Sequence, residues 1–201
     1  MKYVWYASYG SNLLEERFLC YIRGGQPAGS TESEPGARDP SLPLRSIQFS
    51  MPYPLYFAKE RTKWGKGGVA FIRNKRNEQA YTLSKAYLIT LDQFIDVVRQ
   101  ENRLETISID FDTLFKEGSI ELTDGWYNKL LVAGYQDDLP VLTFTSHQDW
   151  PLEEEKAPAS SYEETLLIGL FELGLTKIEA KRYVKAHYPG NERQEEDARG
   201  E

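Results

Sequence analysis

Among its 201 residues the sequence contains one cysteine, Cys20, and two histidines, His147 and His187. A single cysteine excludes a disulfide within the chain and is typical of a reducing compartment, so we expect a cytoplasmic protein. Neither histidine has a second histidine or a cysteine at the spacing of a zinc site. No Gly-x-Ser-x-Gly elbow is present, and Cys20 lies among apolar residues of an expected helix. We therefore expect no metal, no cofactor and no covalent nucleophile.

Long apolar runs and excess positive charge are also missing. No stretch approaches the 18 apolar residues of a membrane span, and the first residues lack the basic and apolar regions of a signal peptide. The 24 lysines and arginines are outnumbered by 31 acidic residues, for a formal net charge of −7. Nonspecific nucleic-acid binding needs a positive face. The expected protein therefore binds neither membranes nor nucleic acid.

Aromatic residues are plentiful, with 13 tyrosines and four tryptophans. This richness is typical of a strand-heavy fold or of an aromatic cleft, without deciding between them. The length fits one domain, which we place at residues 1–188. Residues 189–201 are charged and lack large apolar residues, which predicts a flexible polar tail.

Residues 3–13, Y-V-W-Y-A-S-Y-G-S-N-L, predict a strand that breaks at Gly10 and leads into a helix over 13–21. Asn12 is an N-cap residue, and Glu15 three positions later completes a capping box. Such a junction turns unpaired backbone N–H groups toward one point and suits an anion or a developing oxyanion. An ordinary strand–turn–helix connection explains the same pattern. Residues 23–46 are rich in glycine and proline and predict either a flap over 9–12 or a disordered segment.

Further along the chain, residues 69–72 and 80–89 predict one hairpin, and 126–133 with 141–145 predict a second. Helices are expected over 91–102, from Ser161 to about 173, and over 177–187, each preceded by a capping box. The region from 107 to 115 is typical of either a strand or a short helix. Strands and helices in this order predict an α+β fold.

Glu101 ends an apolar stripe on the expected helix over 91–102, because Leu91, Phe94 and Val98 precede it at spacings of 3, 4 and 3. A carboxylate beside apolar neighbours has its charged form disfavoured, which favours proton transfer near neutral pH. The alternative is that the stripe ends and Glu101 lies in solvent.

These residues resemble the gamma-glutamylcyclotransferase-like family. Tyr9-Gly10-Ser11-Asn12-Leu13 after an aromatic strand resembles its Y-G-S-N-L signature. A glycine-led strand over 67–72, the segment 99–102 around Glu101, and a helix with Tyr162 and Gly169 follow in the family's order. The resemblance spans roughly residues 3–185, except 23–46 and 103–124.

The resemblance implies a small mixed β-barrel flanked by helices, with one cavity. It implies that Tyr9, Gly10, Ser11, Asn12 and Leu13 hold the glutamyl end of a gamma-glutamyl amine or peptide. Glu101 would carry protons so that the substrate cyclises to 5-oxoproline and releases the amine. The chain departs from the family at Asn102, where a glycine is usual, and at Phe144, where a tyrosine is frequent. These departures keep open a non-catalytic binding or regulatory module on the same scaffold.

Overall fold

The computed structural model describes residues 2–28, 30, 32–60 and 64–190. The strands are β1 (Tyr3–Ser8), β2 (Arg45–Met51), β3 (Leu55–Ala58), β4 (Val69–Ile72), β5 (Thr82–Thr90), β6 (Ser119–Glu121), β7 (Lys129–Gln136) and β8 (Leu139–Thr145). The α-helices are α1 (Glu15–Arg23), α2 (Leu91–Glu101), α3 (Phe111–Glu117), α4 (Ser160–Glu172) and α5 (Lys177–Ala186). Two short 3₁₀ turns are η1 (Ser11–Leu13) and η3 (Leu152–Glu154). The fold is α+β, as the sequence predicts.

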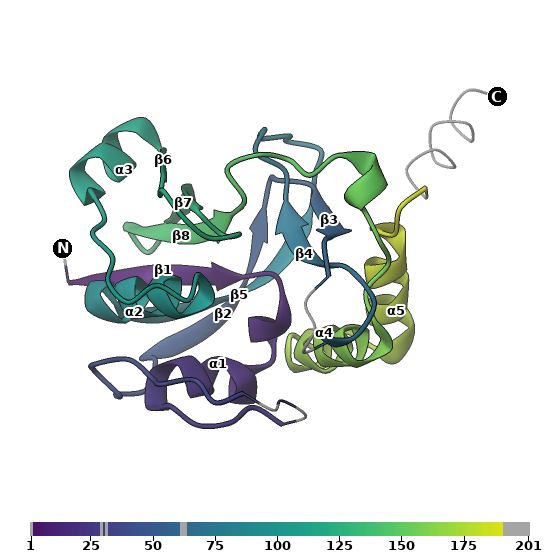
Figure 1. Ribbon diagram of the computed structural model, residues 1–201, viewed down its shortest axis with the longest axis horizontal. Helices are drawn as coiled ribbons and strands as arrows, with labels where there is room; N and C mark the ends of the chain where they lie inside the picture. Colours follow the sequence, from purple (N-terminus) through teal and green to yellow (C-terminus); the bar gives the residue numbers. More distant parts are fainter. Residues whose placement is uncertain (1, 29, 31, 61–63, 191–201) are drawn as a thin grey trace.

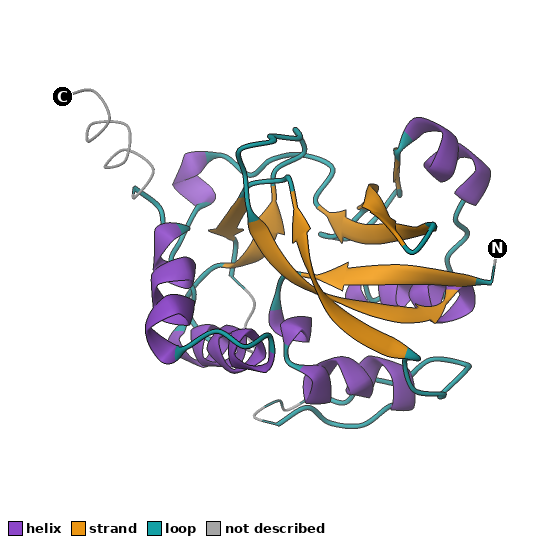
Figure 2. Cartoon of the chain, turned by 180° about the vertical axis from the view of Figure 1, so that it is seen from behind, coloured by secondary structure: helices purple, strands orange, loops and turns teal. Residues whose placement is uncertain are grey.

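Six strands form one mixed sheet in the order β2-β5-β1-β8-β7-β6, in which only the β1–β8 pair is parallel. Strand β1 is therefore central, and five of its six residues are buried. Helix α2 packs along β1 and β5, and Figure 2 shows it behind the long strands. In Figure 1, α4 and α5 stack at the opposite end of the molecule from the N-terminus, near the separate β3–β4 pair.

The expected hairpin of 69–72 with 80–89 is wrong. Strand β4 pairs antiparallel with β3, whereas β5 lies between β1 and β2 in the large sheet. The alternation of apolar residues identified both strands but contained no information about their partners. The second expected hairpin is confirmed as β7 and β8, which turn at Asp137 and Asp138, both with positive φ.

The expected small barrel is not closed by backbone pairing within the described residues, because β3 and β4 form a sheet of their own. Side chains bridge the gap at the free edge of β4. Ala70 donates its N–H to the Tyr162 hydroxyl (3.1 Å) and accepts from the Tyr127 hydroxyl (3.0 Å). Ile72 donates its N–H to Thr145 Oγ1 (3.2 Å) and accepts from the same hydroxyl (2.8 Å).

This bridge yields a stability prediction. Thr145→Val keeps the side-chain shape but leaves a buried N–H and a buried carbonyl of Ile72 without this partner. An unsatisfied buried polar group costs about 1–3 kcal/mol, so we expect a loss of about 2 kcal/mol in the free energy of unfolding. Thr143→Val on the same strand removes a single bond, to the Ala7 carbonyl, and is the matched control. Denaturant unfolding should show a clearly larger loss for Thr145→Val; equal losses would contradict the bridge.

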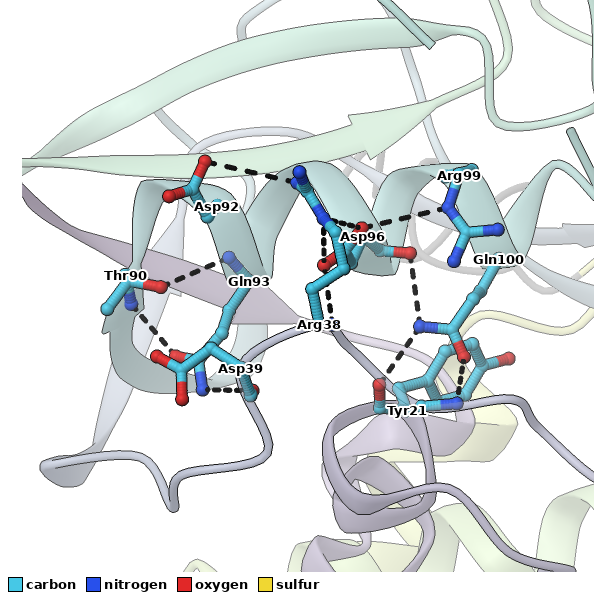
Figure 3. Close-up of polar contacts among 10 residues, drawn as sticks. Tyr21, Arg38, Asp39, Thr90, Asp92, Gln93, Asp96, Arg99 and Gln100 are labelled. Carbon is cyan, nitrogen blue, oxygen red and sulfur yellow. Dashed lines mark hydrogen bonds and ion pairs between the residues drawn. The ribbon is translucent and has the colours of Figure 1, made fainter. Parts of the chain in front are cut away.

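The segment 23–46 is not a flap over residues 9–12. Its residues 36–41 lie along α2 instead. Figure 3 shows that Asp96, which is buried, accepts from the Arg38 backbone N–H (2.9 Å) and the Arg38 side chain (3.1 Å). Gln93 donates to the carbonyls of Asp39 and Ser41, and Gln100 accepts from Gly36. The polar side of α2 thus supplies hydrogen-bond partners for residues 36–41, whereas Gly25 and Glu34 earlier in the segment bond to each other. Disorder, the alternative, does not describe residues 36–41 either. The predicted polar tail lies, from residue 191 on, outside the described residues.

Candidate functional site

The loop after β1 does not form the expected capping box. Residues Ser11–Leu13 form the turn η1, in which the Leu13 N–H donates to the Gly10 carbonyl (2.9 Å), and α1 starts only at Glu15. Its N-cap is Leu14, without a side-chain bond. The Glu15 carboxylate accepts instead from the buried Lys85 ammonium (2.8 Å). The tight turn moves Asn12 off the helix end and leaves its side chain for another partner.

That partner is Glu101. Asn12 Nδ2 donates to Glu101 Oε1 over 3.1 Å, and Tyr6 Oη lies 3.5 Å from the same nitrogen. Asn12 itself is only 3% exposed, and its Oδ1 atom is buried without a hydrogen-bond partner. Glu101 is the last residue of α2, whose Thr90–Gln93 capping box is confirmed. The structure therefore brings the end of α2 and the Tyr9–Asn12 loop to one place.

Both elements line a cavity of about 40 Å³. Of the site residues predicted from sequence, it contains Tyr9, Gly10, Ser11, Asn12 and Glu101. Leu13 is not among its described lining residues; it packs beneath α4, where a Cβ placed on Gly169 would lie 2.5 Å from Leu13 Cβ. Cys20 lies outside the lining as well, and partial burial raises the pKa of its thiol. The remaining lining residues are Tyr6, Ser8, Arg17, Tyr21, Trp64, Val69, Ala70, Tyr127, Phe144 and Tyr162.

The walls of the cavity are aromatic. Tyr6 and Phe144 stack with ring centroids 5.3 Å apart, and Tyr127 contacts Phe144 edge-on at 5.8 Å. The Tyr9 hydroxyl points into the sheet and donates to the Phe144 carbonyl (2.7 Å). A Cβ on Gly10 would lie 3.0 Å from the Tyr162 hydroxyl, so glycine allows the loop to approach this wall closely. The loop is therefore held by the aromatic core on one side and by Glu101 on the other.

The pKa values of three tyrosine hydroxyls in the cavity lining are raised, so these hydroxyls stay protonated at neutral pH. Burial, and after it the negative charge of Glu101, raise the pKa of Tyr6 and of Tyr21. Burial also raises the pKa of Tyr9, with the neighbouring Tyr127 as the next cause. A phenol that cannot ionise is a neutral donor. The single carboxylate of the lining thus lies among neutral hydroxyls and apolar rings, with one guanidinium, that of Arg17, in the same lining.

Asn102 supports the wall from behind. Its amide donates to the carbonyls of Val98 (3.1 Å) and Tyr127 (3.0 Å), and its Oδ1 accepts from the Tyr127 N–H (3.0 Å). A Cβ on Gly125 would lie 2.0 Å from this Oδ1, so glycine is required there. The residue that departs from the family pattern therefore joins the end of α2 to the strand-side aromatic wall.

Arg17, Trp64, Tyr127 and Tyr162 were not predicted as site residues. A signal existed for Arg17, because it lies on the same face of α1 as Phe18 and Tyr21, where an isolated charge is unusual. Trp64 and Tyr127 come from loops whose position depends on tertiary packing. Within the described residues, no three His, Cys, Asp or Glu side chains gather in a way that could hold a metal ion. None of the described helices combines the length and apolar character needed to cross a bilayer.

Comparisons with known proteins bear on the fold. A solved gamma-glutamyl cyclotransferase aligns with this chain over 94% of this chain and 90% of its own length. The TM-score is 0.50 and the sequence identity is 17%. The fold is gamma-glutamyl-cyclotransferase-like. An uncharacterised protein from Homo sapiens aligns similarly, over 95% of this chain and 91% of that one, with a TM-score of 0.51 and 16% identity. At such identities the likeness concerns the fold alone.

In sequence, the chain is 38% identical to histone deacetylase 5 of Arabidopsis thaliana over 202 aligned positions, which include 90% of this chain. It spans 30% of the length of that relative. The name of that relative refers to a much longer protein, of which this chain matches only a part. No protein-family profile matches the sequence.

Proposed function

We propose that this chain is a gamma-glutamylcyclotransferase-type enzyme, which releases 5-oxoproline and an amine from a gamma-glutamyl amine or peptide. The observation that carries the proposal is the 3.1 Å bond between Asn12 of the Y-G-S-N-L loop and Glu101 inside one small cavity. The gamma-glutamyl-cyclotransferase-like fold supports it. The substrate is a small molecule, and the reaction needs only positioned protein groups and a proton carrier.

In the proposed reaction the Glu101 carboxylate takes a proton from the α-ammonium group of the glutamyl moiety. The freed amine attacks the γ-carbonyl carbon and forms a C–N bond, while the carbonyl oxygen gains negative charge. Collapse of this intermediate breaks the original amide C–N bond, and the proton held by Glu101 passes to the departing nitrogen. The ring nitrogen then gives up its remaining extra proton to the freed carboxylate, which passes it to the released amine, so that 5-oxoproline is formed and the amine leaves as an ammonium ion. Of the backbone N–H groups from Gly10 to Leu13, those that precede Leu13 are candidates either to stabilise the oxyanion or to hold a carboxylate, because the Leu13 N–H already donates to the Gly10 carbonyl.

Asn12 contributes at two points. Its Nδ2 orients the carboxylate that carries the proton, and its buried Oδ1 is available to accept a hydrogen bond from a ligand N–H. A buried acceptor without a partner costs about 1–3 kcal/mol. A bound α-amine would satisfy it next to Glu101. The surrounding rings exclude water, which strengthens these interactions.

A binding module is the second candidate, and Phe144 favours it. This residue lines the cavity at the position where the family frequently has a tyrosine, so one possible hydrogen bond to a substrate is absent. A module of this kind would still bind the ligand but would not convert it to product.

The test is a mass-spectrometric assay of 5-oxoproline release from gamma-glutamyl amines of increasing size, with an enzyme-free reaction for spontaneous cyclisation. We expect release above that background with at least one of them. Binding of the same compounds by calorimetry without release would reject the enzyme in favour of the module.

A further inference from the structure

Arg17 is a buried cation in the cavity that the proposed reaction leaves unused. It lies on α1, is 4% exposed, and lines the cavity together with Asn12 and Glu101. Its Nε atom is buried without a hydrogen-bond partner. Within the described part of the chain, no carboxylate forms an ion pair with it. Its recorded partner is the Trp64 ring, whose centroid lies 4.7 Å from the guanidinium carbon.

Such a guanidinium is costly in the absence of a ligand. The effective penalty for burying an ion is several kcal/mol, and a desolvated cation–π contact returns about 2 kcal/mol of it. Charged residues are rarely this buried unless they are paired. An arginine held in this way beside a cavity is therefore prepared for an anion that arrives with the ligand.

The other charge in the lining limits which anion fits. Glu101 lies in the same cavity, so the described lining carries one positive and one negative side chain. A dianion such as phosphate would be repelled by Glu101. A carboxylate carries a single charge and matches the planar fork of guanidinium N–H groups. The 40 Å³ volume also suits a small group.

We propose that Arg17 binds a carboxylate of the ligand within the cavity and so determines its specificity. This rests on the proposed function only for the identity of the ligand. The carboxylate has two sources in a gamma-glutamyl compound: the α-carboxylate of the glutamyl end, or a carboxylate on the departing amine. In the first case the backbone N–H groups of the loop that precede Leu13 are left for the carbonyl oxygen of the substrate.

The first test uses two lactams that differ only in the carboxylate, L-5-oxoproline and 2-pyrrolidinone. Binding to wild type and Arg17→Gln is followed by NMR titration. If Arg17 binds the glutamyl carboxylate, wild type prefers 5-oxoproline by at least about tenfold, and Arg17→Gln loses the preference. Arg23→Gln, at the exposed end of the same helix, is the matched control and keeps it.

The second test compares gamma-glutamylglycine with gamma-glutamylmethylamide in the Glu101→Gln background, with and without Arg17→Gln. A preference for the glycine compound that Arg17→Gln removes assigns the carboxylate to the departing amine. The proposal would be overturned if the Arg17→Gln substitution left the affinities for all four compounds unchanged. It would also be overturned if none of the four compounds bound to the protein with or without this substitution.

Thermal stability separates a binding role from a structural one. Because no carboxylate of the described residues pairs with the guanidinium, ligand-free Arg17→Gln should melt at or above the wild-type temperature. A marked drop in Tm with unchanged ligand preference would show that Arg17 serves the fold instead. These readouts are binding and stability, so they stand even if no compound is turned over; in that case the proposed enzyme fails and the carboxylate site remains.

Discussion

Glu101→Gln is expected to lower 5-oxoproline release by at least about 100-fold, the usual contribution of a positioned general acid–base group. Glutamine is nearly the same size and still offers an oxygen to Asn12 Nδ2, so the 3.1 Å contact can persist. What it cannot do is take up the ammonium proton and return it to the departing amine. The effect should therefore appear in kcat, with a smaller change in KM.

Glu105→Gln provides the matched control. Glu105 follows the same helix, is exposed, and lies outside the cavity lining. Its neutralisation should leave release at the wild-type rate. Equal rates for Glu101→Gln and wild type would remove Glu101 from the mechanism, and circular dichroism would establish that the variant is folded.

Gly169→Ala is expected to destabilise the chain strongly, against the usual gain from replacing glycine inside a helix. A Cβ on Gly169 would lie 2.7 Å from both the Leu13 carbonyl carbon and the Leu14 nitrogen. These are backbone atoms of the loop that carries Asn12, so either α4 or the loop must move. Overpacking of this kind costs about 3 kcal/mol, at the upper end of its usual range. For a domain of this size Tm should fall by roughly 6–12 °C.

The same substitution tests how the site is positioned. A displaced loop would lengthen the Asn12–Glu101 contact, so residual 5-oxoproline release should fall even at temperatures where the variant is folded. Ile168→Ala, at the exposed neighbouring position of α4, is the control and should leave both Tm and release nearly unchanged. A Gly169→Ala protein with wild-type Tm would mean that the approach of α4 to the loop is looser than described.

Capping shows where local sequence suffices and where it does not. Thr90 with Gln93 and Thr176 with Glu179 were predicted as capping boxes, and both are confirmed. Ser161 with Glu164 has the same local pattern and is wrong, because α4 begins at Ser160 after an Ala159 N-cap without a side-chain bond. Asn12 with Glu15 has this pattern too and is also wrong. At Asn12 other contacts decide. The capping signal was overridden by a partner 89 residues away, Glu101, and by the buried Lys85. A capping bond contributes about 1 kcal/mol, so buried polar groups that need partners can outweigh it.

The sequence by itself determined the α+β class, the central aromatic strand and the helix that ends at Glu101, and it indicated part of the cavity lining, namely residues 9–12 and Glu101. These follow from periodicity and short-range hydrogen bonding, which act within a few residues. Tertiary structure decided that β4 pairs with β3, that residues 36–41 lie on α2, and that Arg17, whose buried Nε has no hydrogen-bond partner among the described residues, lines the same cavity as Glu101. Those outcomes depend on which distant surfaces and charges meet when the core closes. The turn at Gly10 to Leu13 depends on both local sequence and tertiary structure. Its composition predicts a break after the strand, and only packing against α2 and α4 turns Asn12 toward Glu101.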